Sequence, residues 1–296
     1  LAIRITEPII TYQKEKIYRK AQSISSNSDA VKIGITGSYG KSSVKEYLAS
    51  LLGVDHKVLK TPENINTEIG VADFMIKNLA ESQAKYFICE MWAYRIWEIQ
   101  KLWEIVEHDH GFLTAIGTQH IWLFWSKEAI EKWKTEIALS VRNKKGRLYA
   151  NGDGNNIERV FSTYLKDASP ISYGTKKRNQ AYSKITKVTE EGSNFIFTYR
   201  GDEYNISTNL IGSHHVSNLS WVLAFCIDEW IQIQNLESAL MNLPLPDHTL
   251  QIIKKDSLTL IDDSYNANPD SVKKSIDLLS SFEGRKILIL GDMLEL

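Results

Sequence analysis

Short apolar runs alternate with longer helical patterns over the first half of the chain. The β-branched run at residues 31–36 has the length and composition of a buried strand. After it, apolar residues recur at helical spacing at Val44, Tyr47, Leu48, Leu51 and Leu52. The same patterns predict further strands at 85–91 and 110–116 and further helices at 71–80 and 129–139. Up to about residue 165, this alternation predicts a doubly wound, mostly parallel α/β sheet flanked by helices.

The middle of the chain changes to short β-rich runs separated by turn residues. The three runs occupy 182–189, 194–199 and 203–210. They predict a small antiparallel β meander at about 182–211 that is attached to the sheet. A long apolar helix is expected after it, from about residue 212 to 233. The last segments predict a strand, a helix and a strand at 257–261, 271–280 and 286–290.

The first residues of the chain differ from both regions. A basic helical segment at 12–21 precedes a polar cluster at 23–29, which is typical of a linker. We therefore expect residues 1–30 to form a solvated helical arm and a linker. The chain starts at Leu1 and stops soon after a predicted strand, so we expect it to be a piece of a longer protein.

The turn between the first strand and the first helix has the composition of a phosphate-binding loop. Its residues are Thr36, Gly37, Ser38, Tyr39, Gly40, Lys41, Ser42 and Ser43. Glycines allow a tight turn whose N–H groups point inward, and the following helix N-terminus favours an anion. Lys41 would reach the outer phosphates, and the Ser42 hydroxyl would be a ligand of Mg²⁺. Ile35 replaces the first glycine of the usual motif, and an ordinary turn with a capping serine is the alternative interpretation.

Two polar residues lie where parallel strands are expected to end, and a polar loop follows the first predicted helix. Glu90 ends the predicted strand at 85–91 and is well placed for Mg²⁺. His120 follows the next predicted strand, although a lone histidine is more often structural than a metal ligand. The amide-rich loop at 60–70 suits a binding loop and a turn before a helix equally well.

Composition narrows the class of protein. Of the 296 residues, 43% are hydrophobic and 24% are charged, which is typical of a globular protein of one large or two moderate domains. The net charge of −1 argues against a nucleic-acid partner, and no apolar run reaches the length of a membrane span. Cys89 and Cys226 lie in apolar runs, which favours a reducing, cytoplasmic location without disulfides.

These segments, taken in order, resemble the Mur ligases. The most specific resemblance is the run Asp-Asp-Ser-Tyr-Asn-Ala-Asn-Pro at 262–269 with Gly-Asp-Met-Leu-Glu at 291–295, a pair typical of one branch of the family. The supporting matches are Thr36-Gly-x-x-Gly-Lys-Ser42, Asn64-x-Asn66-Thr67, Glu90-Met91, Gly117-x-x-His120, Lys134 and Gly212-x-His214 with Asn218. They follow the family's order from about residue 31 to the last residue.

The resemblance implies a domain organisation and a reaction. Residues 31–284 would form the family's central ATP-binding domain, and residues 285–296 would start its C-terminal domain. In this branch, ATP and Mg²⁺ drive amide formation through an acyl phosphate. The reaction joins the dipeptide D-alanyl-D-alanine to a nucleotide-sugar tripeptide in peptidoglycan synthesis. Residues 1–296 alone would lack the amine-binding domain and are expected not to form the amide.

The resemblance also implies roles for particular residues. Lys41, His120 and Lys134 would be catalytic, and Lys134 matches a lysine that many members carry as a carbamate. The metal ligands would be Ser42, Glu90, His120 and Lys134. Besides the loop from Thr36 to Ser43, the nucleotide would contact Asn64, Asn66, Thr67, His214, Asn218, Asp262, Asp263, Tyr265 and Asn266.

The sequence departs from the family pattern beside the expected acyl-phosphate site. Tryptophans replace glycines or an acidic residue at Trp92, Trp97, Trp122 and Trp125. Elsewhere His215 replaces an asparagine, and His248-Thr249 replaces a Gly-Arg pair. These departures leave open a non-catalytic ATP-binding module or partner protein. A folylpolyglutamate or cyanophycin type of ligase is a further alternative, which the run at 262–269 disfavours. A phosphate-loop kinase would not explain the other motifs.

Overall fold

The computed structural model describes most of the chain. The described residues are 2–62, 65–92, 98–116, 127–137, 141, 146–154, 157–245, 248–256, 258–264, 267 and 269–293. Among these residues, every helix is too short or too polar to cross a membrane. Asn64, His120, Tyr265 and Asn266, and the tryptophans Trp97, Trp122 and Trp125, lie outside the described residues.

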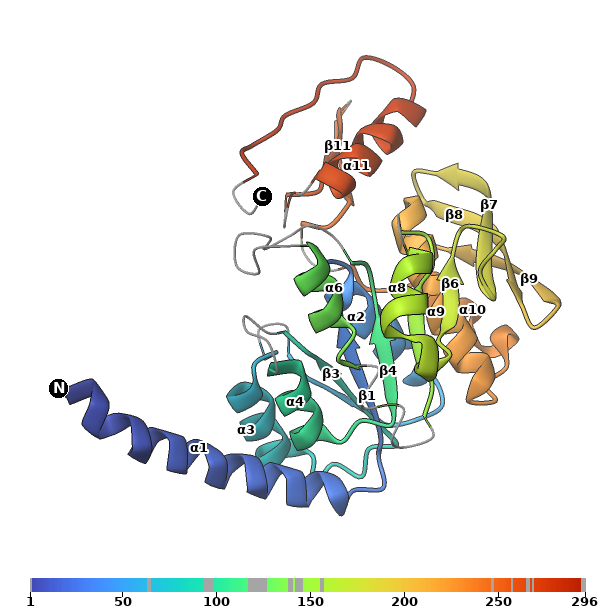
Figure 1. Ribbon diagram of the computed structural model, residues 1–296. Coiled ribbons are helices and arrows are strands. Elements are labelled where there is room, and N and C mark those ends of the chain that lie inside the picture. Colours follow the sequence, from blue (N-terminus) through green and yellow to red (C-terminus); the bar gives the residue numbers. More distant parts are fainter. Residues whose placement is uncertain are drawn as a thin grey trace.

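One large sheet organises the described part of the chain (Figure 1). Its order is β2 (Val58–Lys60), β3 (Tyr86–Glu90), β1 (Val31–Thr36), β4 (His110–Leu113), β5 (Leu148–Asn151), β6 (Ile171–Gly174), β7 (Ala181–Thr189), β8 (Gly192–Tyr199) and β9 (Asp202–Thr208). Neighbours pair in parallel from β2 to β7 and antiparallel from β7 to β9. The predicted fold class, a mostly parallel sheet with an antiparallel meander, is confirmed.

Helices cover both faces of this sheet. The helices are α1 (Ala2–Ser26), α2 (Lys41–Leu52), α3 (Glu68–Asn78), α4 (Glu98–Val106), α6 (Lys127–Lys134), α8 (Ile157–Tyr164), α9 (Ser213–Asp228), α10 (Glu237–Leu240) and α11 (Pro269–Ser281), with short 3-10 turns at Lys166–Ala168 and Ile233–Leu236. In β3, Tyr86 and Ile88 face the core formed with α2 and α9, whereas Phe87 and Cys89 face α3 and α4. This alternation explains why strands buried on both faces appear as unbroken apolar runs.

The N-terminal helix corrects one prediction. Helix α1 continues to Ser26, so most of the expected linker at 23–29 is helical. Its second half packs on α3 and α4 through Ile17, Tyr18, Ala21 and Ile24. These residues recur at helical spacing and form an apolar stripe, which explains why this half is not a solvated arm.

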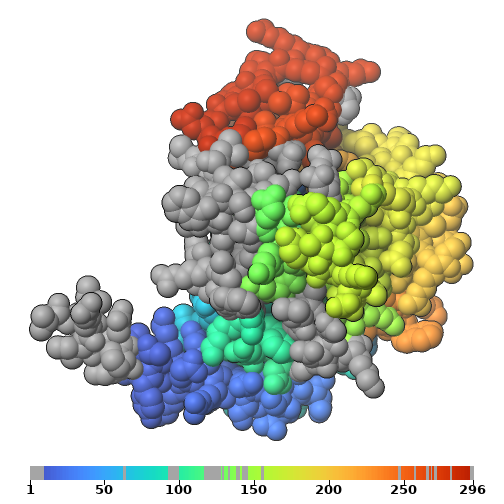
Figure 2. Space-filling model, viewed as in Figure 1, coloured from blue at the N-terminus to red at the C-terminus, as the bar shows by residue number. Residues whose placement is uncertain are grey.

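The C-terminal residues form a small unit of their own. Strands β10 (Gln251–Lys255) and β11 (Leu258–Asp262) make an antiparallel hairpin, and α11 packs on it around Leu250 and Leu278. The unit lies at the opposite end of the molecule from α1 (Figure 2). The strand predicted at 286–290 is wrong, because this segment pairs with no strand among the described residues and Ile289 is 88% exposed.

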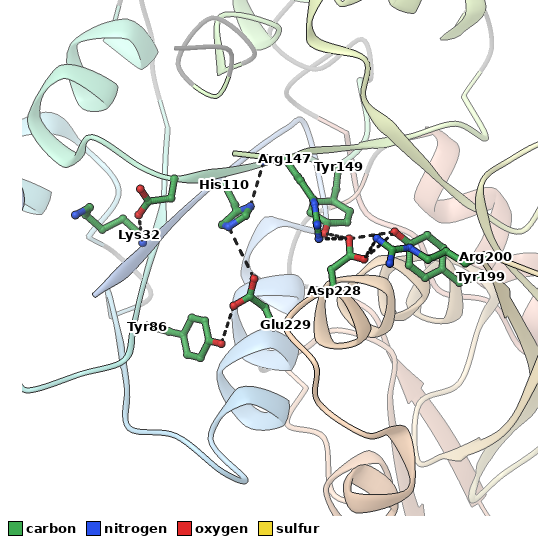
Figure 3. A network of polar contacts seen from close by, with 10 residues as sticks. Lys32, Tyr86, His110, Arg147, Tyr149, Tyr199, Arg200, Asp228 and Glu229 are labelled. Carbon is green, nitrogen blue, oxygen red and sulfur yellow. Dashed lines mark hydrogen bonds and ion pairs between the residues drawn. The ribbon is translucent and has the colours of Figure 1, made fainter. Parts of the chain in front are cut away.

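A polar network around the buried Asp228 ties the last residue of α9 to the start of β5 and to the end of β8 (Figure 3). The Asp228 carboxylate accepts hydrogen bonds from the hydroxyls of Tyr149 (2.6 Å) and Tyr199 (3.0 Å). It also pairs with the guanidinium groups of Arg147 (2.8 Å) and Arg200 (2.5 Å). Burial, and then the Asp228 charge, raises the pKa of both tyrosines, so their hydroxyls remain proton donors.

Helix α9 ends five residues before the predicted limit near residue 233, in a Schellman motif. The N–H of Ile231 donates to the carbonyl of Cys226 (2.9 Å), and the N–H of Trp230 donates to that of Ile227 (3.0 Å). This pattern requires a left-handed residue at position 230, where glycine is usual. Trp230 has φ 64° there, and its side chain is 92% exposed.

We expect Trp230→Gly to raise the free energy of unfolding by about 1 kcal/mol, because glycine adopts the left-handed conformation without a Cβ clash. Urea denaturation of the two proteins measures this difference. Trp230→Ala is the matched control, since it removes the indole but keeps the Cβ atom. Equal stability of the glycine and alanine variants would contradict the explanation by backbone strain.

Candidate functional site

The predicted phosphate loop lies where β1 meets α2, at the C-terminal edge of the parallel sheet. Strand β1 is central, with β3 on one side and β4 on the other, so the loop is at a switch point of the topology. Gly37 and Gly40 have φ values of 147° and 84°. A Cβ atom would lie 1.9 Å from the Thr114 hydroxyl oxygen at Gly37 and 2.8 Å from the Asn218 amide nitrogen at Gly40. Both glycines are therefore needed for the close approach of neighbouring segments.

The segment after β4 holds this loop in place. The Thr114 hydroxyl lies 2.7 Å from the carbonyl of Tyr39 and 3.2 Å from that of Thr36, within hydrogen-bond distance of both. The N–H of Ser38 donates to the carbonyl of Ala115 (2.7 Å). Thr114 was not predicted, because a single threonine after a strand belongs to no motif. Thr114 directly follows β4, the parallel neighbour of β1, and this position would have indicated that it lies near the loop.

Two buried lysines meet at the first glycine of the loop. The side-chain nitrogens of Lys41 and Lys134 both donate to the carbonyl of Gly37, at 3.0 and 3.1 Å. Burial, and then the charge of Lys41, lowers the pKa of Lys134 well below its ordinary value. The Lys41 ammonium also lies 4.6 Å from the ring centre of Trp92, which is a cation–π contact. The structure thus brings together two lysines that are 93 positions apart in the sequence.

A carboxylate lies beside the start of α2. The Ser42 hydroxyl donates to Oε2 of Glu90 (3.0 Å), which ends β3. The Lys45 ammonium lies 3.5 Å from the same oxygen, and both of these charged side chains are buried. Lys45 was not predicted as a site residue, although it follows Lys41 by one helical turn.

The donor atoms beside the loop fit Mg²⁺. Ser42 and Glu90 offer oxygen atoms, which this hard cation prefers. The described residues contain no group of three or more acidic, histidine or cysteine side chains that could hold a metal by themselves. A site with few protein ligands suits Mg²⁺ at phosphates, because the cation takes its other ligands from phosphate oxygens and water. His120 lies outside the described residues, so its predicted ligand role stays a prediction.

The N-terminal half of α9 borders the loop on its other side. The Asn218 side chain is buried against Gly40. Tyr47 on α2 and His215 on α9 are joined by a hydrogen bond between the hydroxyl oxygen and Nδ1 (2.6 Å). Burial lowers the pKa of His215 to about 3 and that of His214 well below its usual value, so both rings are neutral. Their neutral rings suit a base or sugar better than a phosphate.

The amide-rich loop approaches the same edge from the side of α3. The N–H of Trp92 donates to the carbonyl of Asn66 (2.9 Å), which ties the loop to the residues after β3. Thr67 precedes α3 as its N-cap residue. The roles of Asn66 and Thr67 toward a nucleotide stay predictions, as does the role of Asn64.

Asp262 and Asp263 contact residues of the C-terminal unit. Asp262 pairs with Nδ1 of His248 (2.7 Å) and accepts a hydrogen bond from the Ser264 hydroxyl (2.7 Å). The His248 contact is the main cause that lowers the pKa of Asp262. Asp263 accepts from the N–H of Leu250 (3.3 Å) and from the Ser275 hydroxyl. The structure therefore gives His248 a defined partner, the Asp262 carboxylate.

Comparisons with known proteins agree with this arrangement. Residues 35–226 match the family model of the Mur ligase middle domain, and residues 250–296 match that of the Mur ligase glutamate ligase domain. The second match starts earlier than the boundary expected at residue 285, which stays a prediction. The chain is 33% identical over 267 residues to UDP-N-acetylmuramoyl-tripeptide–D-alanyl-D-alanine ligase of Bacillus subtilis, covering 89% of this chain and 56% of that protein.

Solved structures show the same fold. A crystal structure of MurF from Acinetobacter baumannii aligns with a TM-score of 0.83 at 22% identity, covering 95% of this chain and 61% of that chain. MurF ligase from Thermotoga maritima in complex with ADP aligns with a TM-score of 0.81 at 22% identity, covering 92% and 62%. The chain thus spans little more than half the length of these relatives. Because the middle-domain model matches well over half of its residues, the chain belongs to the Mur ligase family.

Proposed function

We propose that this chain is the ATP-binding part of an amide ligase that joins D-alanyl-D-alanine to a UDP-muramoyl-tripeptide in peptidoglycan synthesis. The observation that carries the proposal is the convergence of Lys41, Lys134 and the Ser42–Glu90 pair on one glycine loop. The relative from Bacillus subtilis, named for this reaction, supports the choice of substrates.

The proposed reaction has two steps. A carboxylate oxygen of the tripeptide takes the γ-phosphoryl group of ATP, and ADP leaves. The amine of the dipeptide then attacks the acyl carbon, the phosphate leaves with the bonding electrons, and the amine loses a proton. Phosphorylation is needed because a free carboxylate is a poor electrophile. Negative charge gathers between the two anions, so fixed cations stabilise the transition state.

The residues of the loop have distinct roles in this proposal. Lys41 binds the outer phosphates once its ammonium leaves the Gly37 carbonyl. Ser42 and Glu90 hold Mg²⁺, with His120 as a further ligand, and the cation supplies positive charge at the phosphates. Lys134 has a lowered pKa, which favours the unprotonated amine that CO₂ can convert to a carbamate. Such a carbamate would be an additional anionic metal ligand.

The other predicted residues form the nucleotide site in the proposal. In the proposal, Asn218 and His214 contact the adenine, and Asp262, Asp263, Tyr265 and Asn266 contact the ribose and phosphates. Asn64, Asn66 and Thr67 would contact the phosphates and the acyl substrate. These assignments follow from the motif positions.

The test is phosphate release by the full-length protein that contains this sequence, supplied with Mg-ATP and the UDP-muramoyl-tripeptide. We expect release to require D-alanyl-D-alanine and not to occur with glutamate as the amine. Release with glutamate and a folate instead would support the folylpolyglutamate type of ligase. Nucleotide binding without any release would support the non-catalytic module.

A further inference from the structure

A second buried lysine of α2, Lys45, lies beside the proposed metal position. Lys45 is fully buried in α2, one turn after Lys41. Its ammonium has no hydrogen-bond acceptor among the described residues, and it forms an ion pair with Oε2 of Glu90 at 3.5 Å. Burying an ammonium group in this way is costly unless an opposite charge compensates it. The Glu90 carboxylate is this opposite charge.

Glu90 needs a positive partner before any metal arrives. Its carboxylate is 4% exposed at the end of β3, and the neutral Ser42 hydroxyl donates to the same Oε2 atom. A buried carboxylate without a counter-charge would be strongly unfavourable. Lys45 supplies this charge from the side of α2, which leaves Ser42 and Glu90 as the pair that faces the loop.

The same ammonium affects a cation that binds Glu90. A divalent cation at the Ser42–Glu90 pair would lie close to the positive charge of Lys45, in a site of low dielectric constant where repulsion is strong. A metal complexed with a nucleoside triphosphate is different, because its net charge is negative and Lys45 attracts it. The charge of Lys45 thus weakens the binding of the free metal ion and strengthens the binding of the metal–nucleotide complex.

We propose that Lys45 is a positioning residue for Glu90 that makes the metal enter with the nucleotide instead of alone. The proposal rests on the ligand role of Glu90 in the proposed function. It assigns to Lys45 a control over the order of binding.

The experiment compares the parent chain with Lys45→Met, using Mn²⁺ as a paramagnetic probe in a buffer well above the ordinary pKa of glutamate. Free Mn²⁺ is titrated by electron paramagnetic resonance, and Mn-ATP binding by calorimetry. We expect the variant to bind Mn²⁺ alone about tenfold more tightly, because the repulsion is gone. We expect it to bind Mn-ATP no more tightly than the parent. A purely structural role would move both affinities in the same direction.

Three further proteins complete the test. Glu90→Gln should abolish the tight Mn²⁺ binding in the Lys45→Met background, which locates the metal at Glu90. Lys57→Met removes an exposed lysine and should change neither affinity. Lys45→Gln keeps an N–H donor for Glu90 and replaces the methionine variant if that one fails to fold. Unchanged or weaker Mn²⁺ binding by a folded Lys45 variant would overturn the proposal, whereas failure of the parent to bind Mn-ATP would count against the proposed function.

Discussion

Lys41→Ala is expected to weaken the binding of Mg-ATP about 100-fold, as measured by isothermal titration calorimetry. Charge-assisted hydrogen bonds of an ammonium to phosphate oxygens contribute about 1.5–3 kcal/mol, and the upper part of this range corresponds to a 100-fold change. The Lys41 ammonium donates to the Gly37 carbonyl and lies over the face of Trp92, and both are weaker partners than a phosphate. We therefore expect the phosphates to replace the Gly37 carbonyl as the acceptor of this cation.

The control for this variant is Lys57→Ala, which removes an exposed lysine just before β2. It should bind Mg-ATP like the parent. Circular dichroism should show that both variants keep their helix content, because the glycines and Thr114 determine the shape of the loop. Undiminished affinity of a folded Lys41→Ala protein would mean that the loop does not bind phosphates.

Asp228→Ala is expected to lower the free energy of unfolding by about 2–3 kcal/mol, mainly because the hydroxyls of two buried tyrosines lose their acceptor. The side chains of Arg147 and Arg200 are 41% and 54% exposed, so water can solvate their charges and their loss of a partner costs little. The substitution leaves two guanidinium groups without their shared carboxylate and two tyrosine hydroxyls without their acceptor. The network joins α9 to the start of β5 and to the end of β8. We therefore expect its loss to destabilise the helix and both strands together. Urea denaturation gives the free energy.

Two variants bracket this effect. Tyr199→Phe removes one hydroxyl and should cost about 1 kcal/mol, since Tyr149 and both arginines remain. Asp202→Ala removes an exposed carboxylate at the start of β9 and should change stability by less than about 0.5 kcal/mol. If Asp228→Ala were no more harmful than Asp202→Ala, the network would not contribute to stability.

Local pattern predicted much of this structure. The run at 31–36 and the helix after it are visible because a buried strand and an amphipathic helix each impose their own spacing. Ser42 was predicted from the motif of the glycine loop, and Glu90 from its position at the C-terminal end of a parallel strand. Their hydrogen bond shows that the inferred edge is correct.

The missed features depend on contacts between distant segments. Thr114 acts through the backbone of a loop some 75 positions away, and Lys45 acts through Glu90 across 45 positions. Neither contact leaves a pattern in the sequence. The packed half of α1 was missed because its stripe of small and apolar residues is diluted by lysines. The apolar segment at 286–290 has strand composition, but a strand also needs a neighbour to pair with.

The contact between Lys41 and Trp92 has an optical consequence. An indole changes its fluorescence when a nearby charge moves, and this ring lies 4.6 Å from the ammonium that a triphosphate would draw away. Filling of the phosphate loop should therefore be visible as a change in intrinsic emission. Trp92 would then give this chain a built-in reporter of nucleotide occupancy, without any added dye.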